Sequence, residues 1–280
     1  MKNIVRISFF KVLRILLFTL FLNSYGQSFR FVYDYEFVKD NDNPKQVSNY
    51  MMYLDVKKNT SQFYSYQNFN IDSTKAAFAK KGQFFMAPNK EYIDFKIVKD
   101  LGANKINMLT KVHMRTFDVE DLRNLNWILK DKKDTILGKE VFSAAVNFAG
   151  REWAAWYSPE IAVQDGPYKF HGLPGLIFTI EDATKTHKFS LVAIYKVNDF
   201  TDYPETRESS MAVKISQEEY AKIYRDYRKD PLQSLRGRYP DQIDSDGTFK
   251  SGVEIFREEE KLFKNRIKKD NNIIEIDLLR

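Results

Sequence analysis

The sequence from residue 29 to residue 37 reads Phe-Arg-Phe-Val-Tyr-Asp-Tyr-Glu-Phe. Aromatic side chains recur at every second position of this stretch, and Arg30, Asp34 and Glu36 stand between them. Successive side chains of a β-strand point to opposite faces, so the pattern predicts a strand with one aromatic, buried face. The many Phe and Tyr residues of the chain also suit half-buried strands.

Short alternating segments, separated by turn residues, continue beyond this stretch. They favour one mainly β domain, an antiparallel sheet strongly curved into an open or half barrel, with a closed sandwich as the structural alternative. The pattern resembles that of periplasmic lipoprotein-carrier half barrels, an analogy of fold that implies no function. We expect a helical turn at 118–121 and a charged turn at 131–138. The further strands are expected at 50–56, 63–66, 84–86, 93–97, 106–112, 125–129, 141–148, 152–157, 176–180, 189–197 and 273–279.

The C-terminal part changes to a helical pattern. Ser216 and Glu219 form a capping box, and tyrosines follow it at helical spacing until Pro231. A second amphipathic helix is expected from 253 to 268. We therefore divide the chain into a signal peptide, residues 1–26, and a single mainly β domain, residues 27–280, whose helical C-terminal part covers about 214–270.

The N-terminal 26 residues predict export. Four basic residues and no acidic residue precede an apolar run at 15–22, and the small residues Ser24 and Gly26 follow. This is typical of a signal peptide, which we expect to be cut after Gly26. The run is shorter than the roughly 20 residues of a membrane span, and an uncleaved anchor is the alternative. We expect a periplasmic or outer-membrane-associated protein, with an extracellular destination as the alternative.

The amino-acid composition excludes several classes of function. The mature part retains 40 of the 44 basic residues against 38 acidic ones, so its net charge is near +2 and gives no reason to expect nucleic-acid binding. The chain has no cysteine, which excludes disulfides, thiolate nucleophiles and cysteine-bound zinc. Its three histidines show no metal-ligand spacing, so we expect no metal and no cofactor.

The segment 151–182 is the most distinctive in the chain, because glycine and proline are concentrated at 166–175. Glycine adopts positive φ at little cost and proline fixes its own φ, so this density predicts a defined irregular backbone. The apolar run 176–180 after it predicts a strand buried on both faces. The centre of the segment is the hexapeptide Gly172-Leu173-Pro174-Gly175-Leu176-Ile177.

This segment resembles the GLPGLI family of small exported proteins from Gram-negative bacteria, which is named for the hexapeptide. The flanks also match, at Arg151-x-Trp-x-Ala-Trp-Tyr157, Pro159, Asp165-Gly-Pro167, Ile180-Glu-Asp182 and Ile136-Leu-Gly138. The family often carries a cysteine shortly after that last glycine; here Phe142 lies in that neighbourhood, so any thiol role is absent. The strong match covers 136–182. No reaction is established for the family, so the resemblance implies no catalytic residue.

Two kinds of site remain open. An aromatic cleft for a lipid, other apolar ligand or partner is one, although buried aromatics are more often simple core. A hydrolase is the other, with His171 as a base beside Asp165 or Glu160, although no nucleophile motif accompanies them. We favour a non-enzymatic envelope protein that binds an apolar or amphipathic ligand or an outer-membrane protein. The candidate binding residues are Trp153, Trp156, Tyr157, Tyr168, Phe170 and His171.

Overall fold

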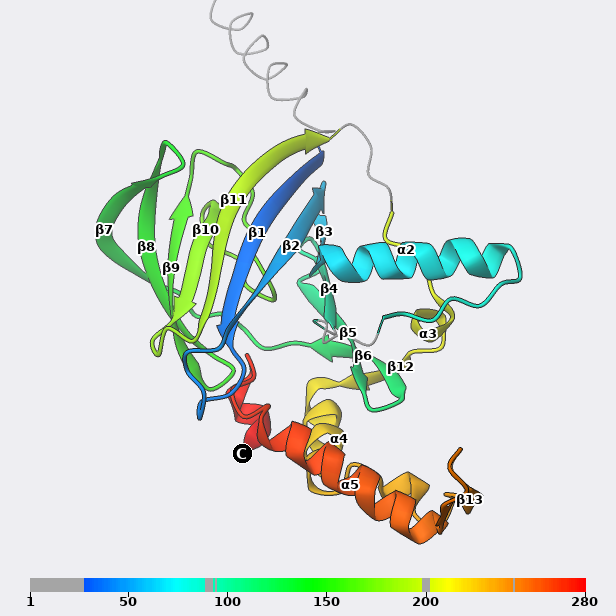
Figure 1. The fold of residues 1–280 in the computed structure, drawn as a ribbon. Helices are drawn as coiled ribbons and strands as arrows, with labels where there is room; N and C mark the ends of the chain where they lie inside the picture. Colours follow the sequence, from blue (N-terminus) through cyan, green and yellow to red (C-terminus); the bar gives the residue numbers. More distant parts are fainter. Residues whose placement is uncertain (1–27, 89–92, 94, 198–201, 244) are drawn as a thin grey trace, which may run out of the picture.

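The computed structural model describes residues 28–88, 93, 95–197, 202–243 and 245–280 (Figure 1). The expected signal peptide, residues 1–26, lies outside the described residues. A sheet of twelve strands dominates the fold, in the order β12-β6-β5-β4-β3-β2-β1-β11-β10-β9-β8-β7. These strands are β1 (Ser28–Val38), β2 (Val47–Lys57), β3 (Thr60–Ser65), β4 (Phe95–Asp100), β5 (Lys105–Val112), β6 (Arg115–Asp121), β7 (Ile128–Ile136), β8 (Lys139–Phe148), β9 (Arg151–Ser158), β10 (Leu176–Asp182), β11 (His187–Val197) and β12 (Val213–Ser216).

The sheet consists of two meanders that meet at β1. Strands β1 to β6 run consecutively in one direction, and β7 to β11 run consecutively back from the far edge. Strand β11 closes the gap by pairing with β1, where Tyr35 lies opposite Phe189. All neighbours are antiparallel except the short β12, which is parallel to β6. The prediction of a mainly β, antiparallel sheet with C-terminal helices is confirmed.

The predicted strong curvature is wrong, because the sheet is neither closed nor strongly curled and ends in two edge strands, β7 and β12. A half barrel buries its apolar face by curling around it. Here the face that carries Phe31, Tyr33 and Tyr35, the inner face, is covered by other parts of the same chain. The residues 159–175 and the C-terminal segment 271–280 pack on it, so the apolar area is removed from water without closure.

Several local predictions are also wrong. Residues 118–121 end strand β6, and 131–136 belong to β7, whose nine residues are nearly all exposed and therefore show no alternation. Residues 84–86 form no strand, and Phe84 is 83% exposed. Residues 276–279 form a 3-10 helix instead of the expected strand, and the Asp277 N–H donates to the Ala149 carbonyl at 3.3 Å.

The helices lie beside the sheet (Figure 1). The capping box of Ser216 and Glu219 is present at the start of α4, and Glu219 N–H donates to Ser216 Oγ at 3.2 Å. The helix at 66–80 was not expected, because it buries no residue and so has no amphipathic pattern. The remaining elements are α2 (Tyr66–Lys80), α3 (Arg207–Ser210), α4 (Gln217–Lys229), the 3-10 turns Gln233–Leu235 and Ile276–Leu279, the small pair β13 (Gln242–Ile243) and β14 (Phe249–Lys250), and α5 (Gly252–Lys268).

Candidate functional site

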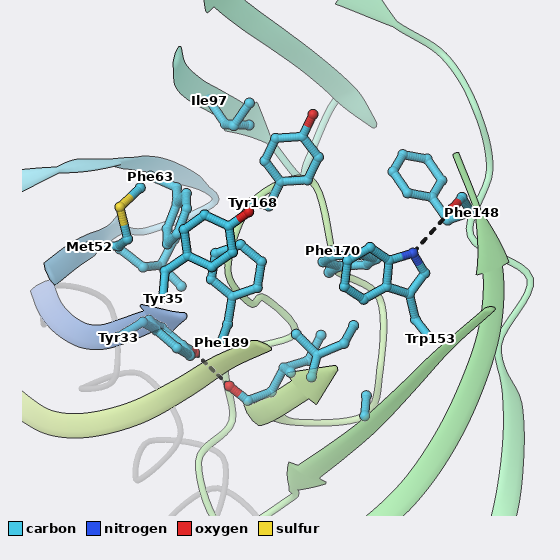
Figure 2. Close-up of a cluster of buried hydrophobic side chains, with 14 of the residues drawn as sticks. Tyr33, Tyr35, Met52, Phe63, Ile97, Phe148, Trp153, Tyr168, Phe170 and Phe189 are labelled. Atoms are coloured by element: carbon cyan, nitrogen blue, oxygen red, sulfur yellow. Dashed lines mark hydrogen bonds between the residues drawn. The ribbon is translucent and has the colours of Figure 1, made fainter. Parts of the chain in front are cut away.

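The connection from β9 to β10, residues 159–175, lies across the inner face, and we call it the plug. Its Tyr168 and Phe170 are almost fully buried, between the rings of β1 and β11 on one side and Trp153 on the other (Figure 2). The rings of Phe170 and Trp153 are 4.8 Å apart in an edge-to-face arrangement, which aromatic pairs prefer. From β1, Tyr33 donates a hydrogen bond to the Ile177 carbonyl at 2.5 Å. The motif segment therefore fills the core of the sheet.

The hexapeptide shapes the exit of the plug. Gly175 has φ +147°, and a Cβ there would lie 2.1 Å from the carbonyl oxygen of Ser158. Gly172 has φ +87° but open space around it. Both glycines use the positive φ that glycine adopts at little cost, and at Gly175 the close approach of the β9 end adds a second reason for glycine.

A buried ion pair fastens the plug to β4. Lys99 Nζ lies 2.5 Å from Asp165 Oδ1, and both side chains are 0% exposed. Lys99 also donates to the carbonyls of Gly166, at 2.7 Å, and Phe170, at 3.3 Å. Burial lowers the pKa of Lys99, and the nearby Asp165 opposes that shift. Lys99 gave no signal in the sequence, because it occupies an inward position among apolar neighbours.

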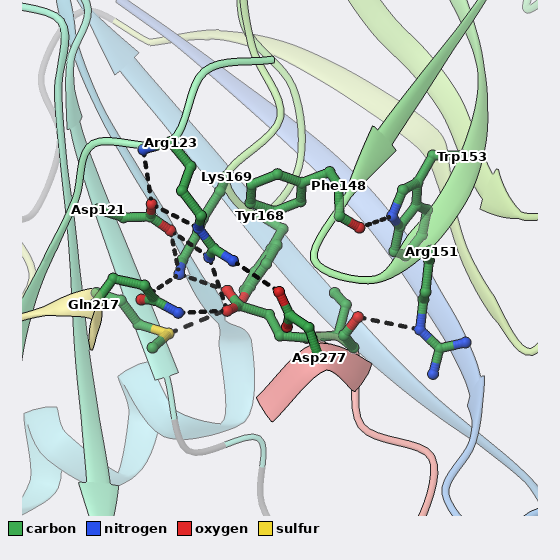
Figure 3. A network of polar contacts seen from close by, with 12 residues as sticks. Asp121, Arg123, Phe148, Arg151, Trp153, Tyr168, Lys169, Gln217 and Asp277 are labelled. Carbon is green, nitrogen blue, oxygen red and sulfur yellow. Dashed lines mark hydrogen bonds and ion pairs between the residues drawn. The ribbon is translucent and has the colours of Figure 1, made fainter. Parts of the chain in front are cut away.

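A second polar cluster joins the plug to the C-terminal segment (Figure 3). Glu275 accepts from Lys169 and Tyr168 at 2.5 Å each, and from Arg123 at 2.8 Å. Lys169 and Arg123 also bind Asp121, at 2.8 and 2.6 Å. Burial opposes the charge of Glu275, but Lys169 and Arg123 outweigh it and keep the pKa of this carboxyl below its usual value. The cluster is a satisfied structural network.

The predicted aromatic site residues are core residues. Trp153, Tyr168 and Phe170 are at most 1% exposed, and Tyr157 is 6% exposed. Trp156 is half-buried on β9. None of these five side chains is among those that line the cavities described below. Their burial favours the core interpretation that the sequence left open.

His171 makes no side-chain hydrogen bond to either of the carboxylates proposed for it. Its Nδ1 is 2.9 Å from the carbonyl oxygen of Lys169, and burial lowers its pKa. Asp165 pairs its backbone with His171 in a β-bridge but directs its carboxylate to Lys99. Glu160 is exposed and binds Lys139 at 2.8 Å. The cavity beside His171 measures about 400 Å³, and no carboxylate of the described residues lines it. This arrangement gives a general base no orienting acid.

An aromatic pocket of about 300 Å³ opens at the rim of the inner face, between the ends of β1 and β2, helix α4 and the C-terminal segment. Phe37 and Tyr50 are half-buried there, and their rings lie 5.9 Å apart on adjacent strands. Phe37 also stacks on Tyr35 at 4.9 Å. Ligand sites are concave, mostly apolar and lined by a few polar groups, which describes this pocket. Its apolar lining comprises Tyr35, Phe37, Tyr50, Ile93, Phe95, Tyr220, Tyr224, Ile273 and Ile274.

A second cavity borders the aromatic pocket. It measures about 710 Å³ and lies between the β5–β6 turn and helices α4 and α5, and it shares Lys111, Tyr224 and Asp270 with the first. Its apolar lining includes Tyr227 and Phe263. Burial raises the pKa of Asp270, and burial likewise raises the pKa of Tyr224 to about 12. The two cavities are therefore neighbours, and Lys111, Tyr224 and Asp270 line both of them.

His187 holds the wall of the aromatic pocket. Its Nε2 is 2.9 Å from the Asn272 carbonyl, which only accepts, so Nε2 carries the proton and Nδ1 accepts from the Tyr35 hydroxyl at 2.7 Å. Burial, reinforced by the charge of Arg151, lowers the pKa of His187 to about 3. The imidazole is therefore neutral at physiological pH and joins β1 to the C-terminal segment.

Sequence reasoning did not assign the pocket, although part of the signal was present. The β1 alternation placed Phe37 on the same face as Tyr33 and Tyr35, and the whole face was interpreted as core. The tyrosines of α4 showed helical spacing. What brings strand and helix together is the C-terminal segment, which no local pattern predicts.

Two further properties concern the described residues only. No helix among them is both long and apolar enough to cross a membrane. No group of three or more metal-ligating side chains comes together in the described part of the chain.

The fold and the pocket define a protein with an open, mainly antiparallel sheet whose inner face is covered by its own chain. The chain belongs to the family described as "Protein of unknown function (Porph_ging)", whose model matches residues 40–179. No curated protein matches its sequence.

Among solved structures, PNGF-II resembles this fold in two crystal forms. Each covers 72% of this chain at 11% identity with a TM-score of 0.50. The likeness spans 34% of PNGF-II, about a third of its length, and it shows the fold alone.

A LolA superfamily protein from Nitrosomonas europaea matches at 9% identity and TM-score 0.28, covering 65% of this chain and 91% of that one. A putative outer membrane lipoprotein-sorting protein domain from Vibrio parahaemolyticus matches at 8% identity and TM-score 0.29, covering 64% and 89%. TM-scores this low carry no argument about the present chain.

Proposed function

We propose that this protein is a non-enzymatic, exported protein of the cell envelope that binds an apolar or amphipathic ligand in the aromatic pocket. The observation that carries the proposal is the pocket itself, in which half-buried Phe37 and Tyr50 stand on a rigid sheet beside a cavity of about 300 Å³. Aromatic side chains left partly exposed in a concave site gain by covering an apolar ligand. The ligand site thus differs from the residues predicted from the sequence.

The cellular location in this proposal rests on the sequence of residues 1–26. It has a basic start, a short apolar run and small residues at the expected cleavage point. We also propose membership of the GLPGLI family, supported by the hexapeptide at 172–177 and its flanks. Thr110, Lys111, Asp270 and Asn272 provide polar lining for the head of an amphipath.

The first test is mass spectrometry of organic extracts from the mature protein, purified gently from its native envelope. A stoichiometric lipid or other apolar molecule is the expected result. A parallel titration uses cis-parinaric acid, a fluorescent fatty acid, as the probe. Tyr50→Glu should weaken its binding by about tenfold or more, because a charge would have to be buried against the ligand.

Met51→Glu is the matched control, because Met51 is the neighbouring residue of β2 and is 47% exposed. Successive side chains of a strand point to opposite faces, so this charge leaves the pocket unchanged. If both variants bind the probe as tightly as the wild-type protein does, the ligand site is not in the pocket. An empty protein with no saturable binding would overturn the ligand proposal and direct work to a partner protein, through cross-linking in the envelope.

A further inference from the structure

Lys99 and Asp165 form the most enclosed polar pair that the proposed function does not use. Both side chains are 0% exposed, and Nζ and Oδ1 are 2.5 Å apart. The pair lies between β4 and the plug, next to Phe170, in the aromatic interior of the protein. Removing two charges from water is costly, and a single ion pair in an apolar interior often fails to recover that cost.

The surroundings of the amine orient it toward the carboxyl group. The Gly166 carbonyl accepts one N–H of Lys99 at 2.7 Å, and the Phe170 carbonyl accepts another at 3.3 Å. The third direction on nitrogen points to Asp165. Once the amine is neutral, its lone pair is available for attack on the carboxyl group that it contacts. Burial lowers the pKa of Lys99 and so favours the neutral amine that a nucleophile requires.

The carboxyl group is arranged for attack as well. The Gly166 N–H donates to Asp165 Oδ1 at 2.7 Å, where negative charge develops when a nucleophile adds to the carboxyl carbon. Oδ2 is buried and has no hydrogen-bond partner among the described residues. One oxygen is therefore stabilised as the carbonyl oxygen, and the other is free to leave.

We propose that Lys99 and Asp165 condense to an intramolecular amide, an isopeptide bond between Nζ and Cγ. The Lys99 ammonium first passes a proton to the carboxylate, and the neutral amine adds to Cγ. The C–Oδ2 bond then breaks, and Oδ2 leaves as water with the two protons that nitrogen gives up. The amide retains one N–H, the atoms and charges balance, and no oxidant, metal or external reagent takes part.

The bond would join β4 permanently to the plug that carries the motif. A cross-link between residues 99 and 165 restricts the unfolded chain in the way that a disulfide does. The chain has no cysteine with which to make a disulfide. Lys169, the other lysine that is fully buried among the described residues, differs, because Asp121 and Glu275 both bind it and Arg123 binds both of these acids. Both oxygens of each of these acids accept hydrogen bonds, unlike Asp165 Oδ2, and we infer no bond there.

Intact-mass spectrometry of the denatured wild-type protein tests the proposal directly. The expected mass is one water molecule below the mass calculated for the mature linear chain. Digestion should give one branched peptide that joins the segments containing Lys99 and Asp165, without tryptic cleavage at Lys99. Lys99→Arg should restore the full mass. Asp165→Asn should lose one ammonia instead of one water and give the same branched peptide.

Lys169→Arg is the matched control and should keep the loss of one water. A folded wild-type protein with the full mass would overturn the proposal, and so would a cross-link that maps to Lys169. The wild-type measurement decides the question even if the variants fail to fold. It is also independent of ligand binding, because an empty pocket does not alter the mass.

Discussion

Glu275 accepts a hydrogen bond from Lys169 at 2.5 Å where neither side chain is more than 2% exposed, and this contact joins the plug to the C-terminal segment (Figure 3). Glu275→Gln keeps the shape of the side chain but removes the charge that Lys169 and Arg123 share. Breaking a buried pair leaves uncompensated charge, so we expect a loss of about 3–5 kcal/mol in the free energy of unfolding. Urea unfolding followed by tryptophan fluorescence measures it.

Glu258→Gln is the control, because Glu258 is 61% exposed and binds Lys250 at 3.0 Å on the surface. That change should cost less than about 1 kcal/mol. If the free energy of unfolding of Glu275→Gln lies within about 1 kcal/mol of the wild-type value, the cluster does not hold the two segments together.

The strand prediction succeeded where one face of a strand is buried and the other is exposed to solvent. Strand β1 is the clear case, because Phe31, Tyr33 and Tyr35 are buried and Glu36 is not. The prediction failed at β7, an edge strand that is exposed on both faces and therefore has no period-two pattern. The capping box of Ser216 and Glu219 was found because a cap is a local interaction, whereas the second one, of Ser251 and Glu254, was not predicted.

The site was less predictable than the fold, for a physical reason. Lys99 and Asp165 are 66 positions apart in the sequence, and only the plug brings them together. The aromatic pocket joins Phe37 to Tyr224 and Ile273, whose positions depend on how the chain end packs on the sheet. The motif itself was recognisable, but its aromatic neighbours serve the core and do not line the pocket.

The two glycines of the hexapeptide should respond differently to alanine. Gly175→Ala places Cβ 2.1 Å from the Ser158 carbonyl oxygen, a backbone atom that cannot move aside easily. We expect a loss of more than about 4 kcal/mol, or an insoluble protein. Gly172→Ala meets nothing within 4 Å and suffers only the strain of positive φ, so about 1 kcal/mol is expected. Thermal unfolding of the two variants measures this difference in stability. Equal losses of stability would contradict the steric explanation.

His187 should make stability depend on pH. The unfolded imidazole binds a proton near pH 6.5, while burial, reinforced by Arg151, lowers the pKa in the folded state to about 3. The contribution of His187 is therefore complete above pH 6.5 and is lost as the pH falls toward 3. Between pH 7 and pH 5 it should decrease by about 2 kcal/mol.

His187→Gln lacks this titration and isolates its effect from that of the carboxylates. Urea unfolding at pH 7 and pH 5 should show a smaller decrease for the variant than for wild type. An equal decrease in both proteins would mean that His187 is protonated in the folded state at pH 5.

Arg151 should control how firmly the chain end lies against the pocket. Its guanidinium binds Asp182 at 2.9 Å, and donates to the carbonyls of Ile273 at 2.7 Å and Ile274 at 3.1 Å. Lysine keeps the charge but lacks the planar fork, so Arg151→Lys retains the ion pair and loses carbonyl contacts. We expect amide hydrogen exchange in residues 272–280 to become about tenfold faster or more.

Arg236→Lys is the control for this measurement, because Arg236 binds Asp230 at 2.8 Å with 61% of its side chain exposed. Exchange in the same residues should then match wild type. Because Ile273 and Ile274 line the aromatic pocket, Arg151→Lys should also weaken cis-parinaric acid binding, while the sheet keeps its protection. Unchanged exchange in residues 272–280 would show that Glu275 and Asn272 hold the segment without the arginine, and the pocket wall would then depend on them alone.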